Sequence, residues 1–405
     1  MIRYKALFLY LYILCIFQVF YLTSFDLYAN VFLFIVSLYG AILFVIKKFY
    51  NNKRIAQIFG LVILVILISI VSAKIAYNQD YVSGLIANRS LLYMFSPFAF
   101  YKYLKSGYMN TERFWKVFRF LLWGYAIYIG TTSLLNVSYT YISPLSGNIT
   151  NVNAGALSKD LIFFGIIYYT LKLILNKKWY YGIAAVILFI ITQLYDIQRG
   201  DLAFLSIIIF LIFFKFRKTG SIKKTILFLP LLLLFLGIIL VSQDSLMTNI
   251  SNKFSQAFKL FNKNASQNNI EDASVFIRIY ETQYAMLQFK EHPITGNGVL
   301  RPSFRKEVLP DAYFYPADIG IIGILYTFGI MGITLFIIIG LFIIKLKNNI
   351  SFNQLNVCAF FFFILYMYMY SFKDGNILLE PVRFSFILIT LLSLGPQYIH
   401  SYKKE

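Results

Sequence analysis

The chain is 405 residues long, with 59% hydrophobic and only 13% charged residues and a mean hydropathy of +0.70. Because soluble domains carry charge on about a quarter of their residues, this composition excludes a soluble globular protein and favours a membrane protein. The formal net charge of +20 would suggest a nucleic-acid partner in a soluble protein, so the position of the charges along the chain decides its meaning.

Apolar segments recur along the whole chain and predict an all-α polytopic membrane protein with about 12 transmembrane helices. The expected spans are residues 6–22, 28–46, 55–73, 84–101, 118–136, 160–175, 180–195, 202–214, 225–241, 318–344, 352–371 and 377–395. Span 202–214 is shorter than the roughly 20 residues that cross a bilayer core, which indicates tilting or local thinning. If the segments around 160–214 are re-entrant, the number falls to about ten or eleven.

Positive charge falls mainly in alternate connections between these spans. With the N-terminus inside, the inner connections and both termini hold 23 of the 37 basic residues but only two of the 17 acidic ones, Glu112 and Glu405. This is the positive-inside pattern, and basic loops facing anionic lipid explain the charge without any nucleic-acid partner. We therefore expect both termini to be cytoplasmic and membrane lipid to be a partner.

Two outer connections are long. Residues 136–159 are rich in Ser, Asn, Gly and Thr, and residues 242–317 are too long for a passive connection. We expect the second to form a partly helical extracytoplasmic cap. It divides the chain into N-terminal membrane helices (1–241), the cap loop (242–317) and C-terminal membrane helices (318–405).

Part of the cap has helical periodicity, over residues 274–291, and should end at His292-Pro293. Gly296-Asn297-Gly298 then permits a tight turn, although Gly-x-Gly alone is a weak phosphate-binding motif. The apolar face of this helix is expected to carry Phe276, Ile279, Tyr280, Tyr284 and Leu287.

Ionisable residues gather at one level, the outer membrane surface, where the cost of burying charge makes each a candidate functional residue. Converging arginines suit an anionic ligand, because guanidinium groups stay charged and bind phosphate or carboxylate oxygens in pairs. The candidates are Arg89, Arg199, Asp201, Arg278, Arg301, Arg305, Asp318, Glu380 and Arg383.

Most candidates also have a structural interpretation. Asp318, at a helix start, is equally suited to be an N-cap, and His292, before a proline, to shape the loop. Arg199 lies in a very tight connection, which favours function. Ion pairing or exposure to solvent or head groups is the structural alternative for Arg278 with Glu281, Glu380 with Arg383, and both Arg301 and Arg305.

Three segments, taken in order, resemble the O-antigen polymerase and O-antigen ligase superfamily of bacterial membrane glycosyltransferases. Residues 197–203, Ile-Gln-Arg-Gly-Asp-Leu-Ala, resemble the family's Ser/Thr-Arg-Gly turn, with Gln198 replacing the hydroxyl residue. Arg278 followed by residues 291–299 is similar to the family's arginine helix running into a Pro-Leu-x-Gly-x-Gly turn. Residues 318–332 are similar to the helix after the large loop, with its Gly-Ile-x-Gly ending.

One departure from the family pattern concerns histidine. Ligases of this superfamily place a histidine near the start of the helix after the large loop, where this chain has Pro316-Ala-Asp-Ile-Gly320. The only histidines in the sequence are His292 and His400. This favours a polymerase over a ligase, although the repeated Arg-x10-Gly loop pattern of some polymerases is not evident.

The resemblance, which covers about residues 140–345, implies a bacterial plasma (inner) membrane polymerase of undecaprenyl-diphosphate-linked oligosaccharides. Catalysis then needs stabilised charge on the leaving diphosphate and a base for the attacking hydroxyl. We assign Arg199 and Arg278 to the diphosphate and Asp318 as the base, with Asp311 or Glu281 in reserve. The expected substrate-binding residues are Arg89, His292, Arg301 and Arg305.

Neither a metal nor a cofactor is implied, since the first outer connection, residues 23–28, lacks the acidic pair of metal-using transferases. Cys15 and Cys358 stand alone in apolar spans and are expected to pack as filler. A chain-length regulator is a further expected protein partner. The alternative functions are O-antigen ligase and lipid-linked oligosaccharide flippase. A flippase should have charges through the bilayer depth and two related halves, which this chain lacks.

Overall fold

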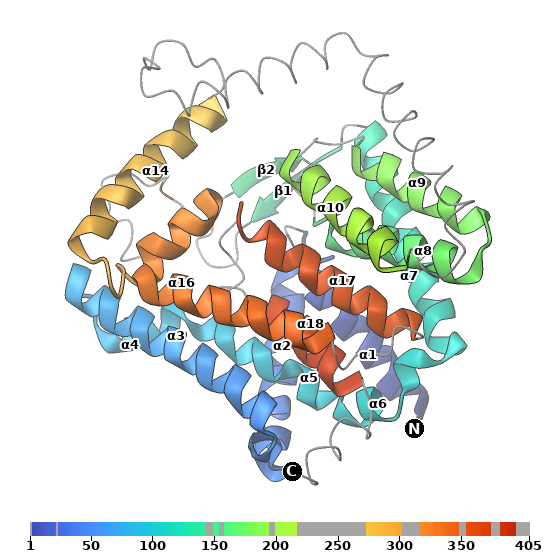
Figure 1. Ribbon diagram of the computed structural model, residues 1–405, viewed down its shortest axis with the longest axis horizontal. Coiled ribbons are helices and arrows are strands. Elements are labelled where there is room, and N and C mark those ends of the chain that lie inside the picture. Colours follow the sequence, from blue (N-terminus) through green and yellow to red (C-terminus); the bar gives the residue numbers. More distant parts are fainter. Residues whose placement is uncertain are drawn as a thin grey trace.

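Apolar helices make up most of the computed structural model (Figure 1). It describes residues 2–21, 23–135, 137–142, 149–153, 158–193, 199–216, 273–301, 314, 316–347, 354–373 and 381–393. The first helices in the chain are α1 (Ile2–Ile16), α2 (Asp26–Ile46), η1 (Phe49–Asn51), α3 (Lys53–Tyr77), α4 (Tyr81–Ala87), η2 (Arg89–Phe95), α5 (Ser96–Ala99), α6 (Tyr101–Lys105), η3 (Tyr108–Asn110) and α7 (Glu112–Leu134). They are followed by α8 (Asp160–Asn176), α9 (Tyr180–Gln193), α10 (Arg199–Phe216), α14 (Ala273–Glu291), η7 (Pro316–Ile319), α16 (Gly320–Leu346), α17 (Leu355–Tyr370) and α18 (Pro381–Ser393).

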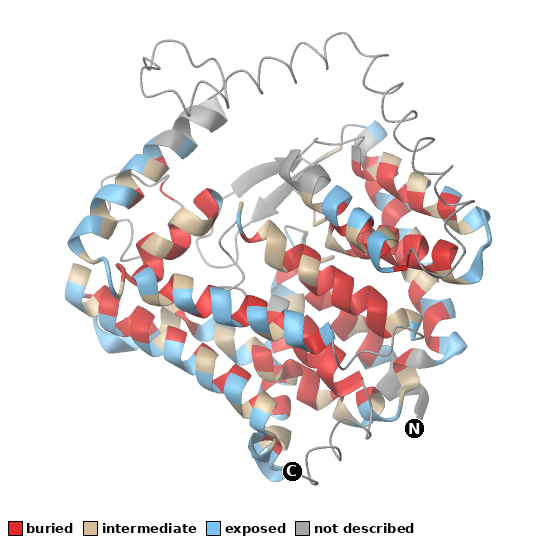
Figure 2. Cartoon of the chain, viewed as in Figure 1, coloured by how far each residue is buried: buried red, intermediate tan, exposed pale blue. Residues whose placement is uncertain are grey.

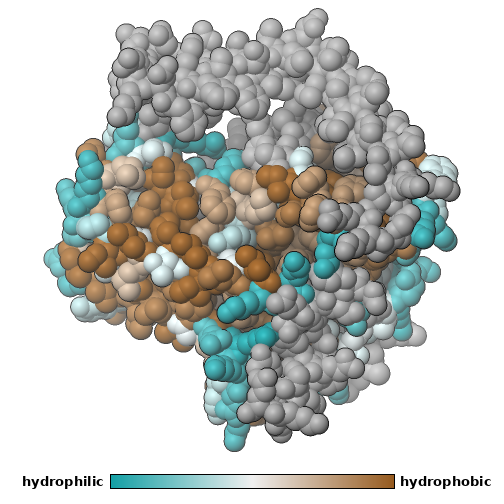
Figure 3. All heavy atoms as spheres, viewed as in Figure 1, coloured by the Kyte–Doolittle hydropathy of each residue, from teal (hydrophilic) through white to brown (hydrophobic). Residues whose placement is uncertain are grey.

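Three of these helices, α2, α3 and α16, are long and apolar enough to cross a membrane, by length and composition, with hydropathies of 2.4, 2.8 and 2.6. Exposed and buried residues alternate along α3 and α16 (Figure 2). Much of the exposed surface is apolar and forms a broad band across the molecule (Figure 3). An apolar surface of this extent suits lipid rather than water, so the chain is a membrane protein.

Aromatic side chains fill the centre, where α8, α17 and α18 meet the chain that follows α1. The ring of Phe17 lies 5.3 Å from that of Phe164, 5.3 Å from that of Phe363 and 4.9 Å from that of Phe386. All four side chains are fully buried. Because lipid is as apolar as these residues, van der Waals packing rather than transfer from water holds this centre together.

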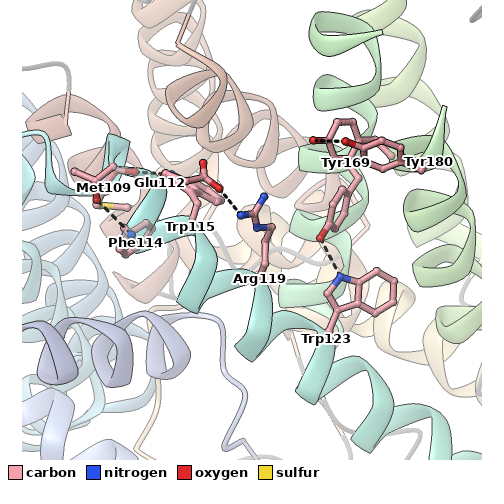
Figure 4. Close-up of polar contacts among 10 residues, drawn as sticks. Met109, Glu112, Phe114, Trp115, Arg119, Trp123, Tyr169 and Tyr180 are labelled. Atoms are coloured by element: carbon pink, nitrogen blue, oxygen red, sulfur yellow. Dashed lines mark hydrogen bonds and ion pairs between the residues drawn. The ribbon is translucent and has the colours of Figure 1, made fainter. Parts of the chain in front are cut away.

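Polar contacts of α7 join it to α8 and neutralise part of its charge (Figure 4). The Trp123 indole N–H donates to the Tyr169 hydroxyl at 2.9 Å, which ties α7 to α8 within an apolar body. About three turns earlier, Glu112 at the start of α7 forms an ion pair with Arg119 on the same helix. Glu112, the acidic residue predicted for this inner connection, is thus paired with a basic residue of its own helix.

Most predicted spans correspond to observed helices, but span 84–101 is wrong as a single helix. Its residues form α4, η2, α5 and the start of α6. The break comes at Asn88, which ends α4 and whose side-chain amide donates to the Gly84 carbonyl at 2.9 Å. Pro97 then lies in the first turn of a new helix, α5, where its missing N–H costs no helical hydrogen bond.

A β-hairpin corrects the all-α prediction in the first long outer connection. Strand β1 (Ser138–Ile142) pairs antiparallel with β2 (Ile149–Asn153), and Ser138 lies opposite Asn153. Tyrosine and the β-branched residues Ile, Thr and Val account for most of both strands and favour this conformation. The predicted span 225–241 lies outside the described residues, so the count of about 12 spans remains a prediction.

Reporter fusions will test the orientation predicted from charge. A fusion at Asn264 should give an extracytoplasmic signal and one at Lys218 a cytoplasmic signal, because basic connections are retained inside. Alkaline phosphatase and green fluorescent protein fusions measure the two sides independently. A cytoplasmic result at Asn264 would contradict the assignment and move every candidate arginine to the other membrane face.

Candidate functional site

The described part of the cap centres on α14, which ends at Glu291, immediately before His292-Pro293, as predicted. Its buried face does not coincide with the apolar face that periodicity predicts. Tyr280 and Leu287 are 43% and 60% exposed, whereas Ala285 is buried against η7 and α16. Apolar periodicity identifies a face that avoids water, but at a membrane surface it does not identify which face packs on protein.

The surface ion pair that was the structural alternative for Arg278 and Glu281 does not fit their surroundings. Arg278 is exposed, whereas Glu281 is only 1% exposed. A buried carboxylate is costly unless its surroundings compensate it. Glu281 is therefore part of the interior between α14 and the membrane body rather than of an exposed pair.

Aromatic residues from four parts of the chain meet beneath α14. The Phe314 ring lies 4.8 Å from the Tyr284 ring on α14 and 4.8 Å from the Tyr326 ring on α16. The Tyr326 hydroxyl is 2.8 Å from the hydroxyl of Tyr77, at the end of α3. This cluster fastens the cap helix to two of the long apolar helices.

Helix α16 is broken at Gly329, where φ is +62° and ψ is −156°. The N–H groups of Asn297 and Gly298 donate to the carbonyls of Tyr326 and Thr327, both at 2.8 Å. Beyond the break, the Ile330 N–H donates to the Pro293 carbonyl at 2.9 Å. The turn that follows α14 thus supplies hydrogen bonds that the interrupted helix cannot make within itself.

Glycine is required on both sides of this junction. At Gly329 a Cβ would lie 2.3 Å from the Ile294 carbonyl oxygen, and at Gly298, with φ of +75°, 2.2 Å from the Ser69 carbonyl oxygen. Both distances are far inside van der Waals contact, so the backbones approach as closely as they do only because no Cβ is present. We conclude that the Gly-x-Gly motif serves backbone packing.

Polar groups in the last part of α3 and just after it hold the same turn from its other side. The Val299 N–H donates to the Ser69 hydroxyl at 3.0 Å. Gln79 is 1% exposed, and its side-chain amide bonds to the backbone on both sides of residue 300. The amide N–H donates to the Val299 carbonyl at 3.1 Å, and the amide oxygen accepts the Arg301 N–H at 2.9 Å. The N–H groups of residues 296–298 all donate to protein carbonyls, so they do not form a phosphate cradle.

Two of the assigned residues lie on adjoining elements. Arg278 is on α14 and Asp318 is on η7, which packs against α14 and leads into α16. Asp318 is exposed, and the N-cap of α16 is Ile319, with no side-chain capping bond. The N-cap interpretation of Asp318 is therefore wrong for α16.

The other described candidates have more specific surroundings. Arg89 is exposed at the start of η2, and its guanidinium donates to the Ile86 carbonyl at 3.4 Å. Helix η2 packs against α2 and α18. His292 is half-buried, and its carbonyl accepts the Gly296 N–H at 2.9 Å, which agrees with a loop-shaping role. Arg301 is exposed beside Gln79.

Several predicted residues are not described at the side-chain level or at all. Arg199 is the first residue of α10, but only its backbone is described. Asp201 is described in the same way. Arg305, Asp311 and Glu380 lie outside the described residues, and of Arg383 only the backbone is described.

Sequence reasoning missed three residues, two in α3 and one just after it, that hold the turn. Ser69, Ser72 and Gln79 are all buried, and the Ser72 hydroxyl donates to the Thr295 carbonyl at 2.9 Å. A signal was present, because Ser69 and Ser72 are three residues apart and share one face of an otherwise apolar helix. Polar residues on a membrane helix normally face protein.

The carboxylate nearest to this anchor in sequence is Asp80, which caps α4. Its side chain accepts the Ser83 N–H at 2.8 Å, and this bond holds the pKa of Asp80 below its ordinary value. Asp80 therefore stays ionised at neutral pH and provides a structural carboxylate at the same end of α3 as Gln79.

Comparison with known proteins agrees with this geometry. Residues 184–337 match the family model described as O-antigen ligase. No curated protein matches the chain. The matched region includes α10, α14, η7, the turn at residues 292–298 and the broken part of α16. Residues 184–337 are thus similar to the O-antigen ligase family, whose members are membrane enzymes acting on lipid-linked saccharides.

Proposed function

We propose that the chain polymerises undecaprenyl-diphosphate-linked oligosaccharide units into surface polysaccharide at the outer face of the bacterial plasma membrane. The observation that carries this proposal is the family match over residues 184–337. The stretch 316–320 contains no histidine, which favours polymerisation over the ligase reaction. The enzyme is accordingly a glycosyltransferase rather than a transporter.

The reaction sets two chemical demands. The bond between the anomeric carbon of the growing glycan and its diphosphate breaks, and its electron pair stays with the lipid diphosphate. The same carbon bonds to a hydroxyl oxygen of the incoming unit, whose proton passes to a base. An enzyme therefore needs fixed positive charge at the diphosphate and a carboxylate at the hydroxyl.

The arrangement around α14 can meet both demands. Arg278 is exposed on α14, and Asp318 is exposed on the adjoining η7. The N-terminal end of α10, which begins at Arg199, lies on the same side of the molecule as α14 and η7 (Figure 1). We assign Arg278 and Arg199 to the diphosphate and Asp318 as the base, with Arg301 near the entrance of the site.

Replacing Asp318 with asparagine should reduce glycan transfer by roughly 10²-fold or more, because an amide cannot accept the hydroxyl proton. Transfer is measured with purified protein and lipid-linked units, and abundance by immunoblotting. Asp80→Asn is the matched control, since asparagine retains the N-cap of α4 while losing an exposed carboxylate. Near-normal polymer from Asp318→Asn would move the base to Glu281 or Asp311.

Gel analysis of surface polysaccharide from a deletion strain tests the function itself. A polymerase mutant should display single repeat units on its final acceptor, because attachment proceeds without polymerisation. Long chains that stay unattached would identify a ligase. Lipid-linked units retained in the cytoplasmic leaflet would identify a flippase, and either result would overturn the proposal.

A further inference from the structure

A second candidate site lies far along α16 from the α14 junction. A cavity of about 1080 Å³ is bounded by the α2–α3 turn, the first half of α3, the last part of α16 and the end of α18. Its basic rim comprises Lys47, Lys48, Lys53, Arg54 and Lys345. Hydrophilic residues gather at the α2–α3 turn and beside the end of α16, bordering the hydrophobic band (Figure 3).

Charge at this rim is one-sided. Five of the lining residues are basic, and none of the described lining residues is acidic. Lys47, Lys48, Lys53 and Lys345 are all exposed. The exposed ammonium groups of Lys47, Lys48 and Lys53 attract an anion placed near the opening. The rim is thus complementary to a negatively charged group.

The walls below the rim are apolar and belong to two of the helices able to span a membrane. Leu64 on α3 is 43% exposed and Leu341 on α16 is 53% exposed, and both line the cavity. Leu61 and Phe342 continue the same surface. A soluble anion would use only the rim, whereas a molecule with an anionic head and apolar chains would satisfy both surfaces.

We propose that this cavity binds an anionic diacyl phospholipid from the adjacent leaflet, with its phosphate at the lysine rim and an acyl chain between α3 and α16. The volume of about 1080 Å³ slightly exceeds the roughly 300–1,000 Å³ of small-molecule pockets, so it admits more than a head group. The site is separate from the residues assigned to glycan transfer.

Gly60 offers a direct way to fill the acyl-chain groove. It is exposed on α3 and lines the cavity, and a Cβ at this position would meet nothing within 4 Å. Gly60→Trp should therefore occupy the groove without disturbing the helix. Gly124→Trp is the matched control, because Gly124 is exposed on α7 with the same open space and does not line the cavity.

Lipid binding is measured by native mass spectrometry of the purified full-length protein after delipidation. Phosphatidylglycerol should bind at least tenfold more tightly than phosphatidylcholine. Gly60→Trp should weaken phosphatidylglycerol binding at least tenfold, while Gly124→Trp leaves it unchanged. Equal binding of both lipids, or wild-type binding by Gly60→Trp, would overturn the proposal.

A second set of variants tests the rim independently of the groove. Changing Lys48, Lys53 and Lys345 together to glutamine should remove the preference for phosphatidylglycerol over phosphatidylcholine. The control changes Lys102, Arg113 and Lys116, three exposed basic residues that do not line the cavity, and should keep the preference. Competition by glycerol 3-phosphate or inorganic phosphate at the lipid's own concentration would show a soluble-anion site and refute a lipid site.

Discussion

Arg278→Ala is expected to abolish polymer formation while leaving the protein at normal abundance. The side chain is exposed on α14, so its loss removes no packing. Removing one group that stabilises developing charge on a leaving group typically costs about 10²–10³-fold in rate. Arg278→Lys should retain a small part of the activity, because lysine keeps the charge but loses the planar fork that binds two phosphate oxygens.

The measurement combines polysaccharide gels with glycan transfer by purified protein. Lys290→Ala is the matched control, since Lys290 is exposed on the same helix and carries the same charge. It should polymerise normally. Arg199→Ala and Arg199→Lys should repeat the Arg278 results if both arginines bind one diphosphate. Full-length polymer from Arg278→Ala would leave this arginine as a surface residue of α14 only.

Gly298→Ala is expected to lower stability strongly and to inactivate the protein as a consequence. Its φ of +75° costs a residue with a Cβ about 1–2 kcal/mol. The new Cβ would also lie 2.2 Å from the Ser69 carbonyl oxygen and 2.5 Å from the Ala73 nitrogen. Forcing the turn away from α3 adds about 1–3 kcal/mol and weakens its bonds to the broken part of α16.

Thermal unfolding in detergent measures this effect, with Gly124→Ala as control. Gly124 lies within α7 with nothing near its added Cβ, so alanine should raise helix stability by about 1 kcal/mol. Gly298→Ala should therefore lower the melting temperature, whereas Gly124→Ala should raise it. Gly298→Ala should lose folded protein and activity together, whereas Arg278→Ala loses activity alone. An unchanged melting temperature for Gly298→Ala would contradict the close packing of the turn on α3.

Local sequence was sufficient to predict the longest apolar helices and the end of α14. Apolar runs of spanning length predicted α2, α3 and α16, and His292-Pro293 predicted where α14 stops, because proline removes a helical hydrogen bond. The Arg-Gly, Gly-x-Gly and Gly-rich helix segments also predicted the superfamily, which the match over residues 184–337 confirms. Each of these features depends on short-range backbone chemistry or on composition.

Only the tertiary structure shows which face of a helix packs against another helix and which face meets lipid. Periodicity placed Tyr280 and Leu287 on the apolar face of α14, but both are exposed, whereas Ala285 and Glu281 are buried. In a membrane, lipid satisfies apolar residues as well as protein does, so an apolar stripe does not reveal which face meets another helix.

The sequence also does not predict that the backbone of the turn at residues 292–298 packs closely against α3 and α16. Glycine permits a positive φ at residues 296, 298 and 329, but nothing local indicates that the turn at 292–298 inserts between α3 and a broken α16. That arrangement needs carbonyls of Tyr326 and Thr327 to accept hydrogen bonds from residues about 30 positions earlier. The sequence by itself thus determined the membrane class, the helices and the family motifs. The fold decided which glycines, serines and carboxylates meet, because those contacts join parts of the chain that local propensity cannot relate.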